Sequence, residues 1–151
     1  MSGSSTLESK VALITGASSG IGAAIARSLA ETGAKLALVG RRFEALQNSS
    51  RLCSRARAIQ AYQTDLADEA QVDRLAKSVQ HDFGGIDILV HSAGVFSQAK
   101  INDTTENDFD AQYQINLRAP SMLTRLLDPS LRSRQGQLVF KIGRASCRER
   151  V

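Results

Sequence analysis

Short apolar stretches alternate with amphipathic segments along most of the chain. Stretches of about four to eight residues bounded by glycine or polar residues predict strands. Five occur, at Val11–Ile14, Lys35–Val39, Arg57–Gln63, Ile86–Val90 and Gly136–Phe140. Between them, apolar residues at helical spacing predict helices over about Gly20–Thr32, Arg42–Arg55 and Asp68–Phe83, and one long helix from Thr105.

The long helix contains both prolines of the chain. Thr105 and Asp108 have the spacing of a capping box, which predicts where the helix begins. Pro120 has no N–H to donate to the helical ladder, so we expect a kink there. Asp128-Pro129 predicts that the helix breaks or ends at that point.

Alternating strands and helices predict an α/β fold in which a parallel sheet is covered by helices on both faces. The length of 151 residues fits one domain. In such a doubly wound sheet, ligands bind outside the carboxyl ends of the strands. We therefore look for functional residues directly after each predicted strand.

Composition and charge exclude several other classes of protein. The net charge is +4, but half of this excess lies in the last ten residues, and no basic stripe with interleaved aromatics occurs elsewhere, so nucleic acid is not an expected partner. No apolar run is long enough to span a membrane, and the polar, flexible residues 1–9 lack a signal sequence. Cys53 and Cys147 form neither a metal motif nor a disulfide framework, so we expect a cytoplasmic protein.

The glycine-rich segment after the first strand is the clearest functional motif. Thr15 is followed by glycines at 16, 20 and 22, and a helix begins at Ile21. The first N–H groups of that helix have no partners within it and attract a phosphate group. Gly16 allows a sharp exit from the strand, Gly20 allows close approach to a pyrophosphate, and Gly22 allows the helix to pack on the sheet. The alternative is a glycine-rich turn without a ligand.

The order T-G-x-x-x-G-x-G resembles the short-chain dehydrogenase/reductase family, in its ordinary rather than its extended branch. This resemblance covers nearly all of Lys10–Phe140 and implies a Rossmann-like, doubly wound parallel sheet, here truncated after the fifth strand. It implies an oxidoreductase that passes a hydride between a nicotinamide cofactor and a carbonyl or secondary alcohol, and a homo-oligomer at full length. The cofactor-binding residues that it implies in this segment are Gly16, Ser18, Ser19, Gly20, Ile21 and Gly22.

The end of the second strand predicts which nicotinamide cofactor is bound. In dinucleotide-binding folds an acidic residue there binds the ribose hydroxyls, whereas arginine accommodates a 2′-phosphate. This chain has Arg41 and Arg42 after Gly40, with no carboxylate in reach at the strand end. A guanidinium group binds phosphate through charge-assisted hydrogen bonds. We therefore predict NADP(H); the alternative is that both arginines are merely solvated.

Two further segments match the family at strand ends. Asp65, followed by Leu66, stands where the family has an aspartate that accepts a hydrogen bond from adenine, although an aspartate that caps a loop is the alternative. His91-Ser92-Ala93-Gly94 stands where the family usually has N-N-A-G. Ala93 and Gly94 match, so we expect a backbone role beside the cofactor. His91 departs from the pattern, and we interpret it as a hydrogen-bonded histidine rather than a catalytic base.

Asn116 is the one candidate from the family's catalytic set. The resemblance implies that this asparagine holds a water molecule that connects the catalytic lysine to solvent; the alternative is a buried asparagine that satisfies the kink near Pro120. The family's serine, tyrosine and lysine are missing from this chain. Its two tyrosines, Tyr62 and Tyr113, are followed four residues later by leucine rather than lysine.

We interpret the last ten residues as having a different origin from the rest of the chain. Ile142–Val151 reads IGRASCRERV, which resembles the translation of a widely used sequencing-library adapter. We therefore divide the chain into residues 1–9, an NADP-binding domain over 10–140 and a non-native tail over 141–151. The nucleotide sequence tests this, because a different series of codons would contradict it.

Two consequences and two alternatives follow from this division. We expect the fifth strand to be an exposed edge and the outer face of the long helix to lack its partner, which predicts a poorly soluble and inactive chain. A nucleotide-binding fragment without catalysis is therefore the second functional hypothesis. A methyltransferase-like α/β fold is a third, but it would have a different glycine spacing and no arginine pair.

Overall fold

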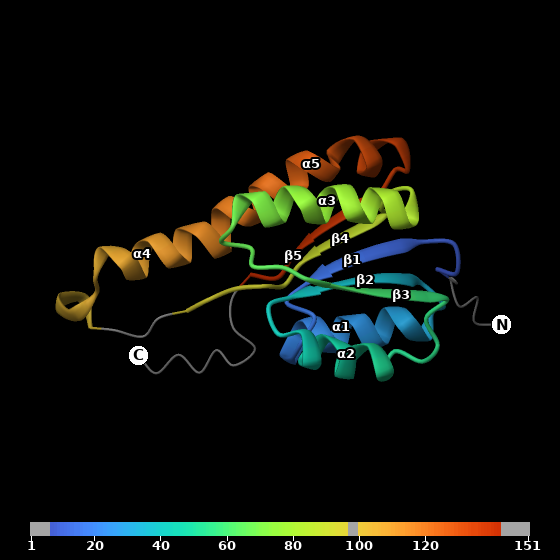
Figure 1. Cartoon of the computed structure of the whole chain (residues 1–151), viewed down its shortest axis with the longest axis horizontal. Helices are drawn as coiled ribbons and strands as arrows, with labels where there is room; N and C mark the ends of the chain where they lie inside the picture. The colour runs from blue at the N-terminus through green and yellow to red at the C-terminus, as the bar shows by residue number, and fades with distance from the viewer. Residues whose placement is uncertain (1–6, 97–99, 143–151) are drawn as a thin grey trace.

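The computed structural model describes residues 7–96 and 100–142 of the chain, which form one α/β unit. Its five strands pair in parallel in the order β3-β2-β1-β4-β5 (Figure 1). Strands β2 and β3 thus lie on one side of β1, and β4 and β5 lie on the other. This order confirms the predicted doubly wound, Rossmann-like sheet. The strands are β1 (Val11–Thr15), β2 (Lys35–Gly40), β3 (Ala58–Gln63), β4 (Ile88–His91) and β5 (Gln137–Phe140).

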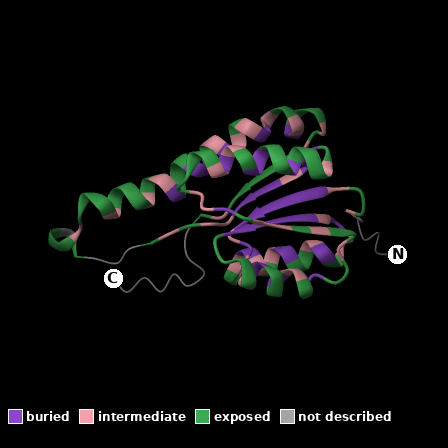
Figure 2. Cartoon of the chain, viewed as in Figure 1, coloured by how far each residue is buried: buried purple, intermediate pink, exposed green. Residues whose placement is uncertain are grey.

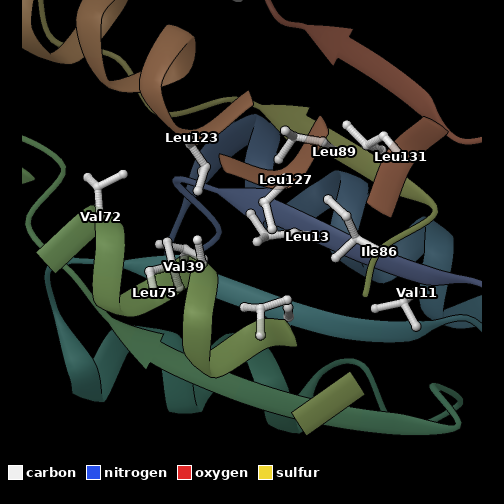
Figure 3. Close-up of a cluster of buried hydrophobic side chains, with 13 residues drawn as sticks. Val11, Leu13, Val39, Val72, Leu75, Ile86, Leu89, Leu123, Leu127 and Leu131 are labelled. Carbon is white, nitrogen blue, oxygen red and sulfur yellow. The ribbon is translucent and has the colours of Figure 1, made fainter. Parts of the chain in front are cut away.

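Helices cover both faces of the sheet. Figure 1 shows α1 (Gly20–Glu31) and α2 (Phe43–Arg51) on one face, and α3 (Glu69–Phe83) and α5 (Ala119–Ser133) on the other. Strand β1 is buried on both sides and is therefore apolar throughout. Its side chains alternate between two hydrophobic clusters. Figure 3 shows the one beneath α3 and α5, which includes Val11, Leu13, Leu123 and Leu127.

Capping groups place the ends of α3 and the start of α4 (Glu106–Tyr113) where the sequence predicts them. The Asp68 carboxylate accepts hydrogen bonds from the N–H groups of Ala70 and Gln71. Gly84 ends α3 in the left-handed conformation, with φ 67°. Thr105 and Asp108 form the expected capping box.

The long helix differs from its prediction near both prolines. After α4, five residues form the π-helix η2 (Gln114–Arg118), which ends just before Pro120. The prediction that Asp128-Pro129 breaks or ends the helix is wrong, because α5 runs through Pro129 to Ser133. Leu127 and Leu131 on either side of Pro129 are buried in the core, and their packing outweighs the lost backbone hydrogen bond.

Two other predicted boundaries differ by a few residues. Helix α2 ends at Arg51 rather than Arg55, because a turn that follows it directs Cys53 into the core. Strand β4 begins at Ile88 rather than Ile86. The N–H of Ile86 donates to the Ser130 hydroxyl of α5 at 2.7 Å instead of joining the sheet ladder.

The Asp87 side chain links the amino ends of β1 and β4. Its buried carboxylate accepts hydrogen bonds from the N–H of Val11 (2.9 Å), from Lys10 Nζ (3.0 Å) and from Arg134 (3.1 Å). Burial alone would raise the pKa of Asp87, but these three donors outweigh it and lower the pKa. The carboxylate therefore joins β1, β4 and the end of α5 on the side opposite the predicted ligand site.

Parts of the two predicted terminal segments lie outside the described residues, namely 1–6 at the start and 143–151 at the end. In the ranges that are described, no helix has the length and apolar character needed to cross a bilayer. Helix α4 projects away from the sheet, and Figure 2 shows that most of its surface is exposed.

Candidate functional site

A cavity of about 920 Å³ lies at the carboxyl ends of the strands, where the doubly wound fold predicts a ligand. It extends from the end of β2, past the glycine-rich loop, to the ends of β4 and β5. Most residues predicted to bind the cofactor line it, as does Asn116, whereas Gly20 and Asp65 do not. The predicted residues in the lining are Gly16, Ser18, Ser19, Ile21, Gly22, Arg41, Arg42, Leu66, His91, Ala93 and Gly94.

Glycine brings three segments of backbone into contact beneath the cavity. Gly16 has φ 68°, and a Cβ atom on it would lie 2.8 Å from the backbone of Ala93. A Cβ atom on Gly22 would overlap the carbonyl oxygen of Gly16. Gly20 differs, because its φ is 56° but a Cβ atom would meet nothing within 4 Å. The loop is therefore tightly packed below and open at Gly20.

The amino end of α1 is open toward the cavity. Ser19 precedes the helix with an extended backbone, and its side chain makes no capping hydrogen bond. The first N–H groups of α1 therefore have neither helical partners nor a side-chain cap, and the helix dipole adds positive potential. Ser18, Ser19 and Ile21 all line the cavity. This end of α1 has the properties of an anion-binding site.

Two arginines add positive charge beyond the end of β2. Arg41 and Arg42 are exposed and line the cavity, and in the described ranges neither guanidinium is in an ion pair. The Gln63 side chain donates to the backbone carbonyl of Arg41 at 3.0 Å, which ties this loop to β3. The guanidinium groups are free to bind an anionic ligand.

The Asp65 carboxylate caps its own loop. Its Oδ1 atom accepts a hydrogen bond of 3.0 Å from the N–H of Ala67, while the Asp65 N–H donates to Gln71. Asp65 is outside the cavity lining, whereas Thr64 and Leu66 on either side belong to it. The geometry matches the loop-capping alternative that the sequence left open.

Thr15 connects the glycine-rich loop to the segment after β4. Its hydroxyl donates to the carbonyl of Val90 (3.3 Å) and accepts from the N–H groups of Ser92 and Ala93 (3.1 Å each). These bonds set the course of the backbone over His91–Gly94 along the cavity wall. Sequence reasoning did not select Thr15, although its position directly before Gly16 was a signal.

His91 is buried at the end of β4 and lines the cavity. Its Nε2 atom lies 2.9 Å from the hydroxyl of Thr124 on α5, and its ring stacks on Phe140 of β5 with centroids 4.8 Å apart. Burial lowers the pKa of His91 to about 4, so the imidazole is neutral at pH 7. This agrees with the interpretation of a hydrogen-bonded histidine.

Asn116 binds the chain that follows β4. Its Oδ1 atom accepts from the N–H of Val95 at 2.9 Å, and its Nδ2 atom donates to the Val95 carbonyl at 2.8 Å. The side chain is exposed rather than buried, so it does not satisfy the kink from within the core. Pro120 has no N–H for the backbone carbonyl of Asn116, four residues earlier. An ion pair between Arg118 and Glu69 ties η2 to α3.

Other residues of the lining were not predicted to bind the cofactor. They come from positions next to strand ends or from η2 and α5, and sequence spacing alone does not bring them together. In the described parts of the chain, no group of three or more histidine, cysteine or acidic residues could hold a metal ion. The unpredicted lining residues are Gly40, Thr64, Ser92, Val95, Phe96, Ile115, Pro120, Phe140, Lys141 and Ile142.

Comparisons with known proteins agree with this arrangement. A family model described as short chain dehydrogenase matches residues 10–148. Galactitol 2-dehydrogenase from Agrobacterium fabrum is 35% identical over 144 residues, which are 94% of this chain and 56% of that protein. An uncharacterized oxidoreductase of Staphylococcus aureus is 42% identical over 112 residues, 74% of this chain and 48% of its own length. The chain thus spans about half the length of these relatives.

Solved structures show the same fold. L-sorbose reductase from Gluconobacter frateurii, complexed with NADPH and L-sorbose, has a TM-score of 0.84 and 35% identity. The similarity covers 89% of this chain and 52% of that one. A metagenomic short-chain oxidoreductase in complex with NADP has a TM-score of 0.83 and 32% identity, over 89% of this chain and 62% of that one.

Proposed function

The chain belongs to the short-chain dehydrogenase family, and on that premise we propose that its cavity binds NADP(H) for hydride transfer to or from a carbonyl or secondary alcohol. The main observation in support of this proposal is that two potential anion-binding sites lie in the same cavity. The open end of α1 would bind the pyrophosphate, and Arg41 and Arg42 would bind the 2′-phosphate. When bound, the nicotinamide ring supplies the hydride chemistry.

The residues present fit this cofactor. The uncapped end of α1 offers N–H groups, and the open space at Gly20 leaves room for a pyrophosphate beside the backbone. The three residues directly after β2 are Arg41, Arg42 and Phe43, so no acidic side chain stands at the strand end to repel a 2′-phosphate, and Glu44 follows in the first turn of α2. Ala93 and Gly94 form a wall of small residues along which a ribose could lie.

Two relatives support the proposed substrate class by their names. Galactitol 2-dehydrogenase is named for a polyol and L-sorbose reductase for a ketose, so each acts on a secondary alcohol or a ketone. We propose the same broad class for the full-length protein. The particular substrate depends on residues that this cavity does not supply, because one fold serves many substrates.

For the 151-residue chain itself, we propose binding without turnover. The Tyr62 hydroxyl donates to Asp82 on α3 at 2.7 Å, and burial together with this hydrogen bond raises the pKa of Tyr62. Tyr113 is exposed on α4. Neither tyrosine lines the cavity, so neither could exchange a proton with a substrate there.

Fluorescence titration with NADPH and NADH tests the cofactor. We expect the chain to bind NADPH more tightly, and R41A/R42A to weaken NADPH binding by about tenfold to a hundredfold, because the net loss of one charge-assisted hydrogen bond costs about 1.5–3 kcal/mol. NADH binding should change little. R51A is the matched control, since Arg51 is an exposed arginine of α2 outside the cavity.

Equal affinity for NADH and NADPH in the unmodified chain would contradict the proposed cofactor. A carbonyl-reduction assay with NADPH separates the two functional hypotheses. We expect no turnover by this chain and turnover by a full-length gene product. Turnover by the 151-residue chain would show that it carries a proton donor other than the family's tyrosine.

A further inference from the structure

The order of the strands sets the direction in which a dinucleotide would lie. The end of α1 follows β1, the two arginines follow β2, and β4 lies on the opposite side of β1 from β2. An NADP molecule with its 2′-phosphate at Arg41 and Arg42 and its pyrophosphate at α1 must extend its other half toward β4. His91 is the last residue of that strand and lines the same cavity.

The imidazole of His91 is held on two sides. Its exposed fraction is 4%, the Thr124 hydroxyl lies 2.9 Å from Nε2, and the Phe140 ring stacks against it. These contacts fix both the position of the ring and the atom that faces α5. The ring is therefore preorganised, and little conformational entropy would be lost if it bound a ligand.

The second ring nitrogen of His91 has no hydrogen-bond partner among the described residues. Nδ1 of His91 makes no hydrogen bond with any described residue, although the side chain is almost fully buried. Every fully buried side-chain nitrogen or oxygen atom in the described ranges does have a partner, so Nδ1 retains some accessible surface. Because His91 lines the cavity, that surface is where a ligand could reach it.

The chemistry of the open nitrogen matches a ribose hydroxyl. A neutral imidazole has one donor and one acceptor nitrogen, and the Thr124 hydroxyl pairs with either tautomer. A ribose hydroxyl also donates or accepts, so it complements Nδ1 in both cases. Nδ1 faces the cavity without a protein partner, so a ligand hydroxyl that reaches it adds a hydrogen bond.

We propose that the His91 side chain hydrogen-bonds the nicotinamide riboside half of NADP(H) through Nδ1, with Thr124 as its positioning residue. The inference rests on the proposed function, because it needs the dinucleotide in the cavity. It assigns a ligand contact to the side chain at the position where His91 departs from the N-N-A-G pattern.

Two ligands that differ by the nicotinamide half test this contact. NADP⁺ carries it, whereas adenosine 2′,5′-bisphosphate has the adenosine with its 2′- and 5′-phosphates but lacks the nicotinamide riboside and the second phosphate of the pyrophosphate. In H91F the ring still stacks on Phe140 but cannot form a hydrogen bond. We expect the Kd of NADP⁺ to rise about threefold to tenfold in H91F, the effect of one neutral hydrogen bond, and the Kd of the bisphosphate to stay unchanged.

Each other outcome has a distinct meaning. Equal weakening of both ligands, or no change in either, overturns the role of His91 while leaving the proposed cofactor intact. If neither ligand binds the unmodified chain, the proposed function itself fails. T124V gives a second variant, in which the ring loses its positioning hydroxyl, and we expect a smaller loss that is again confined to NADP⁺.

Nitrogen-15 spectra of the unmodified chain provide a measurement that needs no variant. The chain has two histidines, and His81 is exposed on α3, so it serves as an internal reference. We expect NADP⁺ to shift the Nδ1 resonance of His91, while adenosine 2′,5′-bisphosphate leaves it in place and His81 responds to neither. An Nδ1 resonance that NADP⁺ does not move, at saturating concentration, refutes the contact.

Discussion

The two glycines at the start of α1 differ in what a methyl group would meet. In G22A the Cβ atom would overlap the Gly16 carbonyl, and because both partners are backbone the loop must shift, so we expect a loss of about 3 kcal/mol in unfolding free energy. In G20A the space is open and only the positive φ is strained, which costs about 1 kcal/mol. Urea unfolding of both variants measures the difference, and equal losses would contradict it.

His91 makes stability depend on pH. Its pKa is lowered from 6.5 in the unfolded chain to about 4 in the fold, so the unfolded state binds the proton first as the pH falls. Stability is therefore complete above pH 6.5 and is lost between pH 6.5 and 4. We expect the unfolding free energy to fall by about 2 kcal/mol from pH 7 to pH 5. Urea unfolding at both values tests this, and H91N should remove most of the slope.

Motifs predicted those site residues whose chemistry depends on local sequence. Gly16 and Arg41-Arg42 follow strand ends directly, so their place at the cavity could be predicted. The role of Thr15 could not, because its partners Ser92 and Ala93 are more than seventy residues away in sequence. For Asp65 the sequence left two roles open, and the structure shows its carboxylate accepting a hydrogen bond from the neighbouring Ala67 N–H.

Pro129 lies inside α5 although proline is unfavourable in the interior of a helix, so the packing of α5 must outweigh this unfavourable preference. The residue is exposed, and it removes a hydrogen bond from the interior of α5. We expect P129A to raise the unfolding free energy by about 1–3 kcal/mol, because the N–H returns and the steric conflict disappears. The exposed S121A in the same helix is the control, with an expected change below about 0.5 kcal/mol. A P129A protein no more stable than the original would show that Pro129 does not destabilise α5 at this position.

The elements were predicted best where local and tertiary preferences agree. All five strands and both ends of α3 could be predicted, because apolar runs, an Asp cap and a terminal glycine act within a few residues. The π-helix before Pro120 could not, since its extra residue is accommodated by the contacts of Asn116 with Val95 and of Arg118 with Glu69. Such contacts depend on the assembled fold rather than on periodicity.

At the scale of the molecule, two rows of exposed apolar side chains stand out among the described residues. Phe109, Tyr113 and Leu117 follow one another at four-residue intervals along α4 and η2, and each is more than half exposed. Leu138, Val139 and Phe140 of β5 are exposed at the edge of the sheet. Large exposed apolar patches promote association, so we propose that α4 mediates contact with a second copy of the chain.

Sedimentation velocity tests this association. We expect L117E to lower the associated fraction at a given concentration, because it places a charge at the end of the apolar row that lies in η2. E106Q, at an exposed residue of α4 outside the row, should leave it unchanged. If L117E associates as strongly as the original chain, the exposed strand β5 rather than α4 is responsible.

The position of β1 at the centre of the sheet has a consequence for synthesis on the ribosome. Its neighbour β2 begins at Lys35, but its other neighbour β4 begins only at Ile88. A growing polypeptide can assemble β1, β2 and β3 with α1 and α2 early, and must then wait for β4 and α5. Until β4 has been synthesised, the edge of β1 that later pairs with β4 has exposed backbone N–H and C=O groups. We therefore expect a chaperone to be needed most during this interval.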